Sequence, residues 1–518
     1  MKTPFQTLLN RFRIAQDRVR ARLQLRRSLP APRPAFRPCV IALAILFSGA
    51  VLPAQQSKPW EKIPVPPLPE FKPQQPKRIE LKNGIVIFLQ EDHELPFVSG
   101  SILIPGGALD EGASNSGLID LYGQTWRTSG TAKMSGDAMD DLLESKAAHI
   151  ETAGGEESTS LAWDSLKADS DLVLALALDL LFHPKFSAEK LQLAQQQEAT
   201  SIVRRNDDEG QIAEREAAKL VYGADSPYAR QPELKTIGSV TVAALQAWHD
   251  RTLRGKLIIG ISGDFDQTAM EQKLRAAFES LPPVQHAPPR HDTFHEPKQA
   301  VYFINKEDVN QSNVQIVGLG TDRHNPDVPT LAVMDDILGG GFASRLFQSV
   351  RTAKGLAYSV GGGIGFAYDH PALFDVDVLT QSKTTVDATK EALNQIDGMN
   401  STPFTDEELK RAKDDILNTF LFRYDTRDKV LAERVRLEFY GYPADYLETY
   451  EAAIRKVTLP DLTAAAKKYI HPNQLAILVV GNQSEIKPGL DTLDLGPVKP
   501  IDISIPGAPA GGPGGEKE

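Results

Sequence analysis

An arginine and a tyrosine seven residues apart are the side chains best placed to do chemistry in this sequence. Arg351 and Tyr358 lie within Gly339–Val360, where a glycine triplet ends one predicted helix, a short amphipathic helix follows and a strand opens at Leu356. A guanidinium and a phenol both donate hydrogen bonds, and at this spacing both could point into one cleft. In the competing, structural interpretation Arg351 pairs with an acid and Tyr358 caps the core.

The elements that must position this pair occur twice along the chain. The apolar strand LIIGISGD (Leu257–Asp264) has a counterpart in LAILVVGN (Leu475–Asn482), and the helices between them recur in the same order. The period is roughly 220 residues, which is too long for a solenoid and indicates a duplicated domain. Proline-rich composition marks the joints between these domains. The predicted segments are a signal over 1–54, a linker over 55–76, an N-terminal domain over 77–280, a linker over 281–298, a C-terminal domain over 299–485 and a flexible tail over 486–518.

Charge and the N-terminal residues indicate export. The chain has 518 residues and a net charge of −11, but residues 1–55 hold ten Lys and Arg against one acid, so the body is strongly acidic, which argues against nucleic acid as a partner. The Arg-rich start and the apolar run Val40–Leu52 have the pattern of a secretory signal, with cleavage expected near Ala54. An uncleaved membrane anchor is the alternative. The single cysteine, Cys39, lies inside this segment, so we expect a cysteine-free periplasmic or secreted protein.

Two stretches carry a resemblance to a known family. SRLFQSVRTAKGLAYSV (Ser344–Val360) and GLIDLYGQTWRTSGT (Gly117–Thr131) resemble the M16 metallopeptidases, the pitrilysin, insulinase and mitochondrial processing peptidase group. The similarity runs from about Arg78 to Asn482 and fits the shorter bacterial two-domain type. It implies an α+β fold of two homologous M16-type domains, each an antiparallel-rich mixed sheet packed with helices, joined by the proline-rich linker.

The metal site that the resemblance implies is degenerate here. The family's first helix carries His-x-x-Glu-His, in which two histidines bind zinc and the glutamate polarises a water. The corresponding positions are Asp120, Gly123 and Gln124, and the family's third ligand falls at or near Ser201. Neighbouring Glu198 could replace it, but an Asp and a Glu without histidine would suit a hard cation better than zinc. The favoured interpretation is two acids on solvated helix faces, so we expect no metal and no cofactor in this chain.

The second half keeps what the first half lacks. In the family an Arg and a Tyr at this spacing lie near the zinc of the other domain, and Arg351 and Tyr358 match both identity and spacing. Such donors suit substrate binding and the oxyanion of a tetrahedral intermediate, whereas Arg345 of the same motif is expected to hold its helix in place. The resemblance therefore implies a catalytic and substrate-binding pair in a chain that is inactive alone.

The expected complex is an exported heterodimer. Its partner would be a zinc-bearing M16 paralogue and its substrate a peptide, with no nucleic acid and no membrane contact except through an uncleaved signal. The alternative is a catalytically inert M16-fold scaffold or peptide-binding protein.

Overall fold

The computed structural model describes residues 72–285 and 292–508. The chain divides into two compact units, residues 1–67 and 68–518, and every described residue belongs to the second. The predicted signal over 1–54 and most of the linker over 55–76 therefore lie outside the described residues. None of the helices that the structure describes combines the length and the apolar character needed to cross a membrane.

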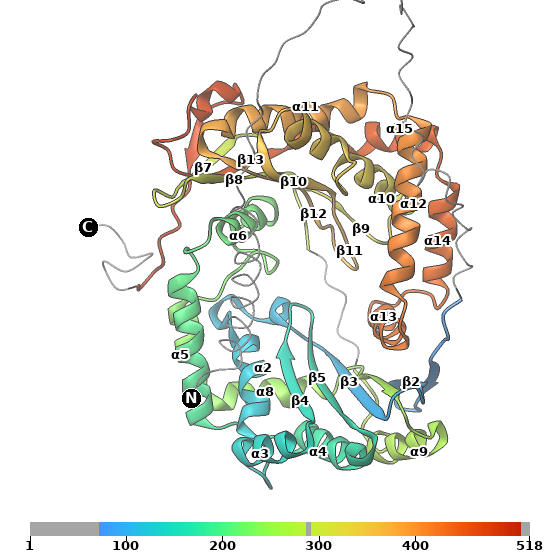
Figure 1. Cartoon of the computed structure of the whole chain (residues 1–518). Coiled ribbons are helices and arrows are strands. Elements are labelled where there is room, and N and C mark those ends of the chain that lie inside the picture. Colours follow the sequence, from blue (N-terminus) through green and yellow to red (C-terminus); the bar gives the residue numbers. More distant parts are fainter. Residues whose placement is uncertain (1–71, 286–291, 509–518) are drawn as a thin grey trace, which may run out of the picture. The chain divides into compact units, whose positions relative to one another are not determined.

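Two six-stranded sheets form the framework, and their strand orders repeat each other (Figure 1). The first sheet has the order β1 (Lys77–Glu80), β2 (Val86–Glu91), β6 (Ile258–Gly263), β3 (Phe97–Pro105), β5 (Ser158–Leu166), β4 (His149–Gly154). The second sheet has the order β14 (Val498–Pro500), β7 (Val301–Asn305), β13 (Ala476–Gly481), β8 (Gln311–Leu319), β12 (Leu373–Gln381), β10 (Ala357–Ile364). In both sheets the second and third strands of this order pair in parallel and the next pairs are antiparallel. The predicted α+β fold with two mixed sheets is confirmed.

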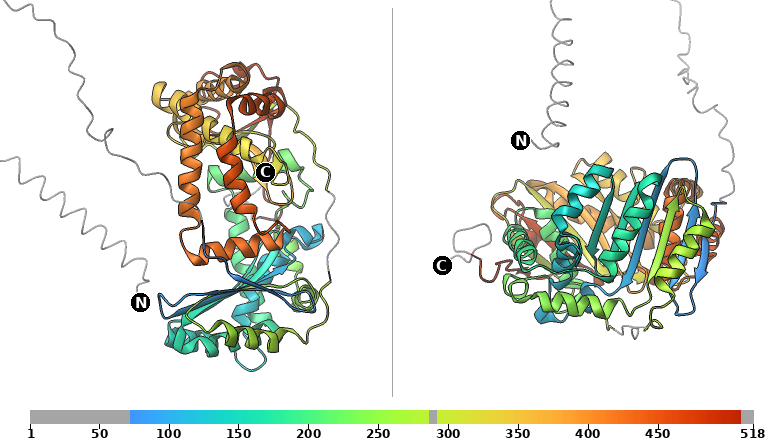
Figure 2. Two further views of the ribbon diagram at one scale, coloured as in Figure 1. Left: turned by 90° about the vertical axis from the view of Figure 1, so that its right-hand side faces the viewer. Right: turned by 90° about the horizontal axis from the view of Figure 1, so that it is seen from below.

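Helices cover the sheets because their apolar stripes need a buried surface. In Figure 2 the helices α3, α4 and α9 lie along one face of the first sheet, and their apolar residues join its core. The helices of the first half are α2 (Leu118–Ser129), α3 (Gly136–Lys146), α4 (Ser170–Phe182), α5 (Ala188–Arg204), α6 (Glu209–Tyr222), α7 (Leu234–Ser239), α8 (Val242–Thr252) and α9 (Gln267–Phe278). Those of the second half are α10 (Val328–Leu338), α11 (Thr385–Ser401), α12 (Asp406–Arg423), α13 (Arg427–Phe439), α14 (Tyr446–Lys456) and α15 (Leu459–Tyr469).

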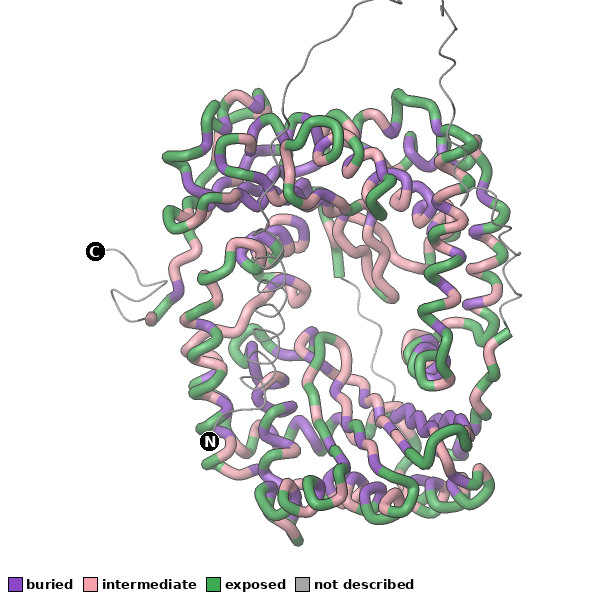
Figure 3. The backbone as a smooth tube through the Cα atoms, in the orientation of Figure 1, coloured by how far each residue is buried: buried purple, intermediate pink, exposed green. Residues whose placement is uncertain are grey.

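Each half lends one helix to the sheet of the other half. Helix α6 buries Ile212 and Val221 against Val317 and Leu478 of the second sheet. Helix α13 buries Leu431 and its neighbours against the first sheet. The burial pattern in Figure 3 follows this arrangement, with buried residues on the facing sides of these helices and strands. The two halves therefore share apolar cores as well as a linker.

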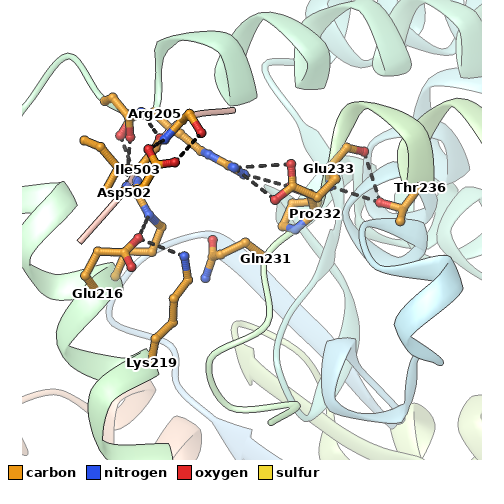
Figure 4. A network of polar contacts seen from close by, with 12 residues as sticks. Arg205, Glu216, Lys219, Gln231, Pro232, Glu233, Thr236, Asp502 and Ile503 are labelled. Atoms are coloured by element: carbon orange, nitrogen blue, oxygen red, sulfur yellow. Dashed lines mark hydrogen bonds and ion pairs between the residues drawn. The ribbon is translucent and has the colours of Figure 1, made fainter. Parts of the chain in front are cut away.

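The segment after residue 485 corrects the sequence prediction. A flexible tail was predicted over 486–518, but residues 486–508 are ordered: β14 pairs with β7, and Ile505 is only 1% exposed within the core of the first half. Figure 4 shows how polar groups hold this segment beside α6, and the Asn206 side chain donates to the Ile503 carbonyl at 2.7 Å. A strand pairing and one apolar side chain order a segment whose composition favours disorder. Residues 509–518 lie outside the described part.

Candidate functional site

The segment that carries Arg351 is a wide helical turn packed on the second core. The predicted short amphipathic helix is present, but its residues Phe347–Ala353 form a π-helix, labelled η5, and the strand β10 begins at Ala357 rather than Leu356. Leu346 and Val350 are fully buried in the core of the second half, which fixes the inner side of this turn. Short π-helical segments occur often at functional sites, and here the turn presents its outer side to solvent.

Arg351 and Tyr358 meet at the outer side of this turn. The Arg351 Cζ lies 5.4 Å from the ring centroid of Tyr358 and 4.9 Å from that of Phe347, both within the range of a cation–π contact. The Tyr358 side chain is 68% exposed and so does not cap the core. In the part of the chain that the structure describes, no carboxylate forms an ion pair with Arg351. Among the described residues Arg351 therefore does not pair with an acid, and Tyr358 does not cap the core. Instead, two hydrogen-bond donors lie side by side at the surface.

Two acids, Glu408 and Glu391, bind side chains that lie on either side of Arg351 in the chain. Arg345 donates from Nε to Glu408 Oε1 at 2.7 Å and from Nη2 to Oε2 at 3.1 Å, which agrees with the expected anchoring role of this arginine. Glu391 accepts hydrogen bonds from Ser349 and Lys354, which flank Arg351 in the chain. Although burial raises the pKa of Glu391, these bonds lower it to about 2. The pair is therefore presented by a segment that is fixed at both ends.

The glycine triplets beside this site contact each other through their backbones. Gly339 ends α10, and a Cβ added there would lie 2.3 Å from the Gly362 carbonyl oxygen of β10. Gly362 itself has φ +124°, which favours glycine. The first triplet therefore ends a helix, as predicted, and the second, Gly361–Gly363, lies inside β10 and keeps its pairing with β12. Strand β10 is an edge strand of its sheet, so its outer backbone groups face away from the neighbouring strand β12.

A cavity of about 640 Å³ lies beside the glycine contact, and sequence reasoning missed its acids. Burial raises the pKa of Asp335 to about 8, although the Ile364 N–H donates to its Oδ1 at 3.0 Å. Burial likewise raises the pKa of Asp375 to about 7. The periodicity of α10 and β12 could have placed these aspartates on one face, but the cavity requires the packing of α12 and α14 as well.

Backbone atoms of β4 fill the space beside Gly123, the position of the family's general base. A Cβ added at Gly123 of α2 would lie 2.3 Å from the Gly154 nitrogen and 2.9 Å from the Ala153 carbonyl carbon of β4. The Thr152 hydroxyl also donates to the Gly123 carbonyl at 2.6 Å. Contacts below 3.0 Å to backbone cannot be relieved by moving a flexible side chain. Residue 123 therefore has no room for a glutamate while α2 and β4 keep this contact.

Among the other positions of the degenerate metal site and the neighbouring Glu198, only Asp120 and Glu198 carry a carboxylate. Gln124 and Ser201 are exposed, and Asp120 and Glu198 are half-buried on α2 and α5. Burial raises the pKa of both acids, and the charge of Asp120 raises that of Glu198 further. Asp120 therefore interacts with Glu198, and its charge also raises the pKa of Glu111, but among the described residues these side chains do not bring three ligand atoms together as one group. The donor set does not fit zinc, which prefers nitrogen and sulfur ligands in a tetrahedral arrangement.

Comparison with known proteins shows which family the sequence resembles. The family model for the peptidase M16 inactive domain matches residues 239–416. The "Non-peptidase homolog YmxG" of Helicobacter pylori is 23% identical over 412 residues, covering 78% of this chain and 93% of that protein. The "Uncharacterized zinc protease YmxG" of Bacillus subtilis is 22% identical over 377 residues, covering 70% and 88%. The chain is a homologue of M16 peptidases, and its matched segment is of the inactive-domain type.

Solved structures show the same M16 fold. The peptidase M16 inactive domain from Pseudomonas fluorescens superposes with a TM-score of 0.70 at 22% identity, covering 79% of this chain and 98% of that chain. A protease from Helicobacter pylori gives a TM-score of 0.69 at 16% identity, covering 79% and 100%. At these identities the likeness carries the fold, so the function must be argued from the residues of the site.

Proposed function

We propose that this chain is the non-zinc-binding subunit of an exported M16-type heterodimeric peptidase. In this proposal Arg351 and Tyr358 bind the peptide and stabilise the transition state at a metal centre held by a paralogous partner. One contrast carries the proposal: the half-buried Arg351 and the exposed Tyr358 lie side by side on an anchored segment, whereas the base position at Gly123 is filled by backbone. The N-terminal sequence supports export.

The chemistry asked of this chain is donation of hydrogen bonds. An attacked peptide carbonyl develops negative charge on its oxygen, and preorganised donors aimed at that oxygen stabilise it. The Arg351 guanidinium is a planar fork of N–H donors, and its contacts with the rings of Phe347 and Tyr358 restrict its position. The phenol of Tyr358 would donate to the substrate backbone from the same side.

An extended peptide fits the surroundings of the pair. Strand β10 begins one residue before Tyr358 and lies at the edge of its sheet, and β4 is the corresponding edge of the first sheet. A peptide can add a strand to such an edge, with main-chain hydrogen bonds supplying affinity. Addition to β10 would bring the peptide backbone alongside the donor pair.

The test is reconstitution with the partner. The tagged chain is purified from its source cells, co-purifying M16 paralogues are identified by mass spectrometry, and peptide hydrolysis by the complex is measured. Arg351→Ala should lower kcat/KM about a hundredfold or more, as loss of one oxyanion donor does elsewhere, with the heterodimer intact on gel filtration. Arg351→Lys keeps the charge and loses the planar fork, so it should recover activity only in part. An intact complex that remains fully active with Arg351→Ala contradicts the proposal.

An inert scaffold is the second candidate. The printed name of the Helicobacter pylori relative, a non-peptidase homolog, favours it, as does the closed position at Gly123. A scaffold needs the sheets and helices of the fold but not a half-buried guanidinium without an ion pair beside an exposed phenol. The Arg351 variants separate the two candidates, because only the peptidase subunit loses activity with its assembly unchanged.

A further inference from the structure

A group of metal-ligating side chains lies where the two halves of the chain meet. Glu157 belongs to the turn between β4 and β5 of the first half, whereas Asp369 and His370 precede β12 in the second half. Each of the three offers one ligand atom, and these atoms all lie within 4.8 Å of one another. The His370 Nδ1 lies 2.8 Å from Asp369 Oδ1 and 3.8 Å from Glu157 Oε1. We call these three side chains the junction cluster.

The separations within the junction cluster suit ligands of a single ion. Zinc is bound by histidine nitrogen and by carboxylate oxygen at about 2.0–2.2 Å, so two atoms that share one zinc ion lie about 3.0–3.4 Å apart. The separations of 2.8 Å and 3.8 Å at the His370 Nδ1 bracket this range. Rotation of the carboxylate groups can therefore bring the ligand atoms onto one ion.

Backbone hydrogen bonds fix both turns that carry the junction cluster. The Glu157 carbonyl accepts from the Gly106 N–H at 3.0 Å, which holds the turn between β4 and β5. The Tyr222 hydroxyl, at the end of α6, donates to the Pro371 carbonyl at 2.9 Å and so holds the residue that follows His370. Ligands that the surrounding structure positions in advance lose little freedom when a metal binds.

Aromatic rings enclose the junction cluster. The side chains of Glu157 and His370 are each only 13% exposed, and the His370 ring lies 4.3 Å from that of Tyr228 between centroids. Tyr440, which follows α13, donates its hydroxyl to Glu157, and its ring stacks on Tyr368 at 4.5 Å and an interplanar angle of 7°. The two helices that each half lends to the other, α6 and α13, therefore both end beside this cluster.

The cluster also brings two acidic groups together in a partly buried place. Burial raises the pKa of Glu157 to about 7, and the charge of Asp369 contributes to the rise, although the hydrogen bond from Tyr440 lowers it. A bound cation is often the largest local charge in a site and reverses such effects. An ion in the cluster would therefore favour the charged form of both carboxyl groups.

From this geometry we propose that Glu157, Asp369 and His370 bind one divalent transition-metal ion, which ties the two halves of the chain together. The imidazole nitrogen favours zinc over calcium and magnesium, because those two ions take oxygen ligands. A water or the Tyr440 hydroxyl would complete a tetrahedral set. Uptake of the ion releases the protons that the ligand atoms hold. The inference does not rest on the proposed function, because this ion joins two parts of one chain.

The test measures metal uptake by the purified, untagged chain. The protein is treated with a chelator, dialysed, and titrated with Zn²⁺ and with Ca²⁺ in separate calorimetric experiments. Bound metal is then counted by elemental mass spectrometry, and thermal unfolding is followed with and without Zn²⁺. The two test variants are His370→Ala, which removes the nitrogen ligand, and Glu157→Gln, which keeps the size of the side chain and an acceptor for the Tyr440 hydroxyl.

Two control variants separate this cluster from other places that could take a metal. His324 is a matched histidine, because its Nδ1 lies 3.5 Å from Asp322 Oδ1 and its ring stacks on Tyr442 at 4.8 Å. The described residues place no third ligand atom with that pair, so His324→Ala should leave metal uptake unchanged. Asp120→Asn tests the degenerate site of the first half in the same way.

We expect one zinc ion per chain and a higher Tm with zinc, because the ion binds the folded chain. His370→Ala should weaken zinc binding about a hundredfold or more, and Glu157→Gln about tenfold or more. The proposal is wrong if the wild-type chain takes up no zinc, if it binds calcium more tightly than zinc, or if Asp120→Asn abolishes uptake. If His370→Ala does not fold, Glu157→Gln decides, and an unchanged zinc affinity in that folded variant overturns the proposal.

Discussion

Placing a side chain at Gly123 should destabilise the first half of the molecule. The new Cβ of Gly123→Ala would meet the Gly154 nitrogen at 2.3 Å, about 0.7 Å inside the 3.0 Å limit that real Cβ contacts respect. The strand cannot retreat freely, because a Cβ at Gly154 would in turn meet the Ile119 carbonyl oxygen of α2 at 2.3 Å. Overpacking of this kind costs about 1–3 kcal/mol, and the better helix propensity of alanine returns at most about 1 kcal/mol.

The assay is urea or thermal unfolding with a second glycine as control. Gly398 lies in α11, and a Cβ there would meet only the Thr402 hydroxyl at an ordinary 3.7 Å. Gly398→Ala should therefore stabilise the chain by up to about 1 kcal/mol. The clash at Gly123 is with backbone on both sides and so falls in the upper part of the overpacking range, about 2–3 kcal/mol, which leaves a net destabilisation of about 1–2 kcal/mol for Gly123→Ala.

A stronger test of this contact is to restore the whole His-x-x-Glu-His motif of the family. The triple variant Asp120→His, Gly123→Glu, Gln124→His should bind no stoichiometric zinc in its native fold and should cleave no peptide, because the glutamate has no space beside β4. Zinc content after dialysis and hydrolysis with and without a chelator are the measurements. A Gly123→Ala variant as stable as wild type, or a folded triple variant that hydrolyses peptides with zinc, would refute the reasoning.

Three further outcomes follow from single contacts. Because the pKa of Asp335 is raised to about 8, ionisation of this carboxyl disfavours the folded state. Asp335→Asn should therefore gain stability relative to wild type as pH rises from about 4 to about 8, by up to about 1.4 kcal/mol per pH unit, and the difference should stay constant above about pH 8. Thermal unfolding at several pH values tests this. Glu391→Gln should lower the Tm at neutral pH, and the difference should shrink as pH falls from about 4.5 towards 2, because in that window the unfolded chain takes up a proton at Glu391 while the folded chain keeps the charge that binds Lys354. Ile505→Ala should cost about 2–4 kcal/mol in urea unfolding, as for other buried isoleucines, and an effect below 0.5 kcal/mol would contradict its place in the core.

Local patterns were enough to predict the framework. The apolar runs at Leu257–Asp264 and Leu475–Asn482 became the central strands β6 and β13, because a strand covered on both faces reads as a continuous apolar run. A capping box of Thr405 and Glu408, a pattern that can be read from the sequence, marks the start of α12. The spacing of Arg351 and Tyr358 also placed them across one helix-to-strand turn, and the structure brings them into contact.

What the sequence could not predict depends on contacts between distant segments. Gly123 reads as a helix-weakening residue until Gly154, which lies 31 residues later, is packed against it. Ile505 lies among prolines and glycines, and only the core of the first half explains why its segment is ordered. Phe342 follows a glycine triplet and gives no periodic signal, so its ring contact with Phe347 could be known only from the fold of η5.

The shared cores explain why a half without its metal ligands is retained. Helix α6 of the first half covers apolar residues of the second sheet, and Ile505 of the C-terminal segment is buried in the first core. Removing the first half would expose Val317 and Leu478 and leave Ile505 without its pocket, so the half that presents Arg351 depends on the degenerate half to fold. The fold therefore needs neither zinc ligands at Asp120 and Gln124 nor a general base at Gly123 to keep the sheet and helices around them. The contact of β4 with Gly123 then does not lower the stability of the fold, because tight helix-to-strand packing fills the space that a catalytic glutamate would need.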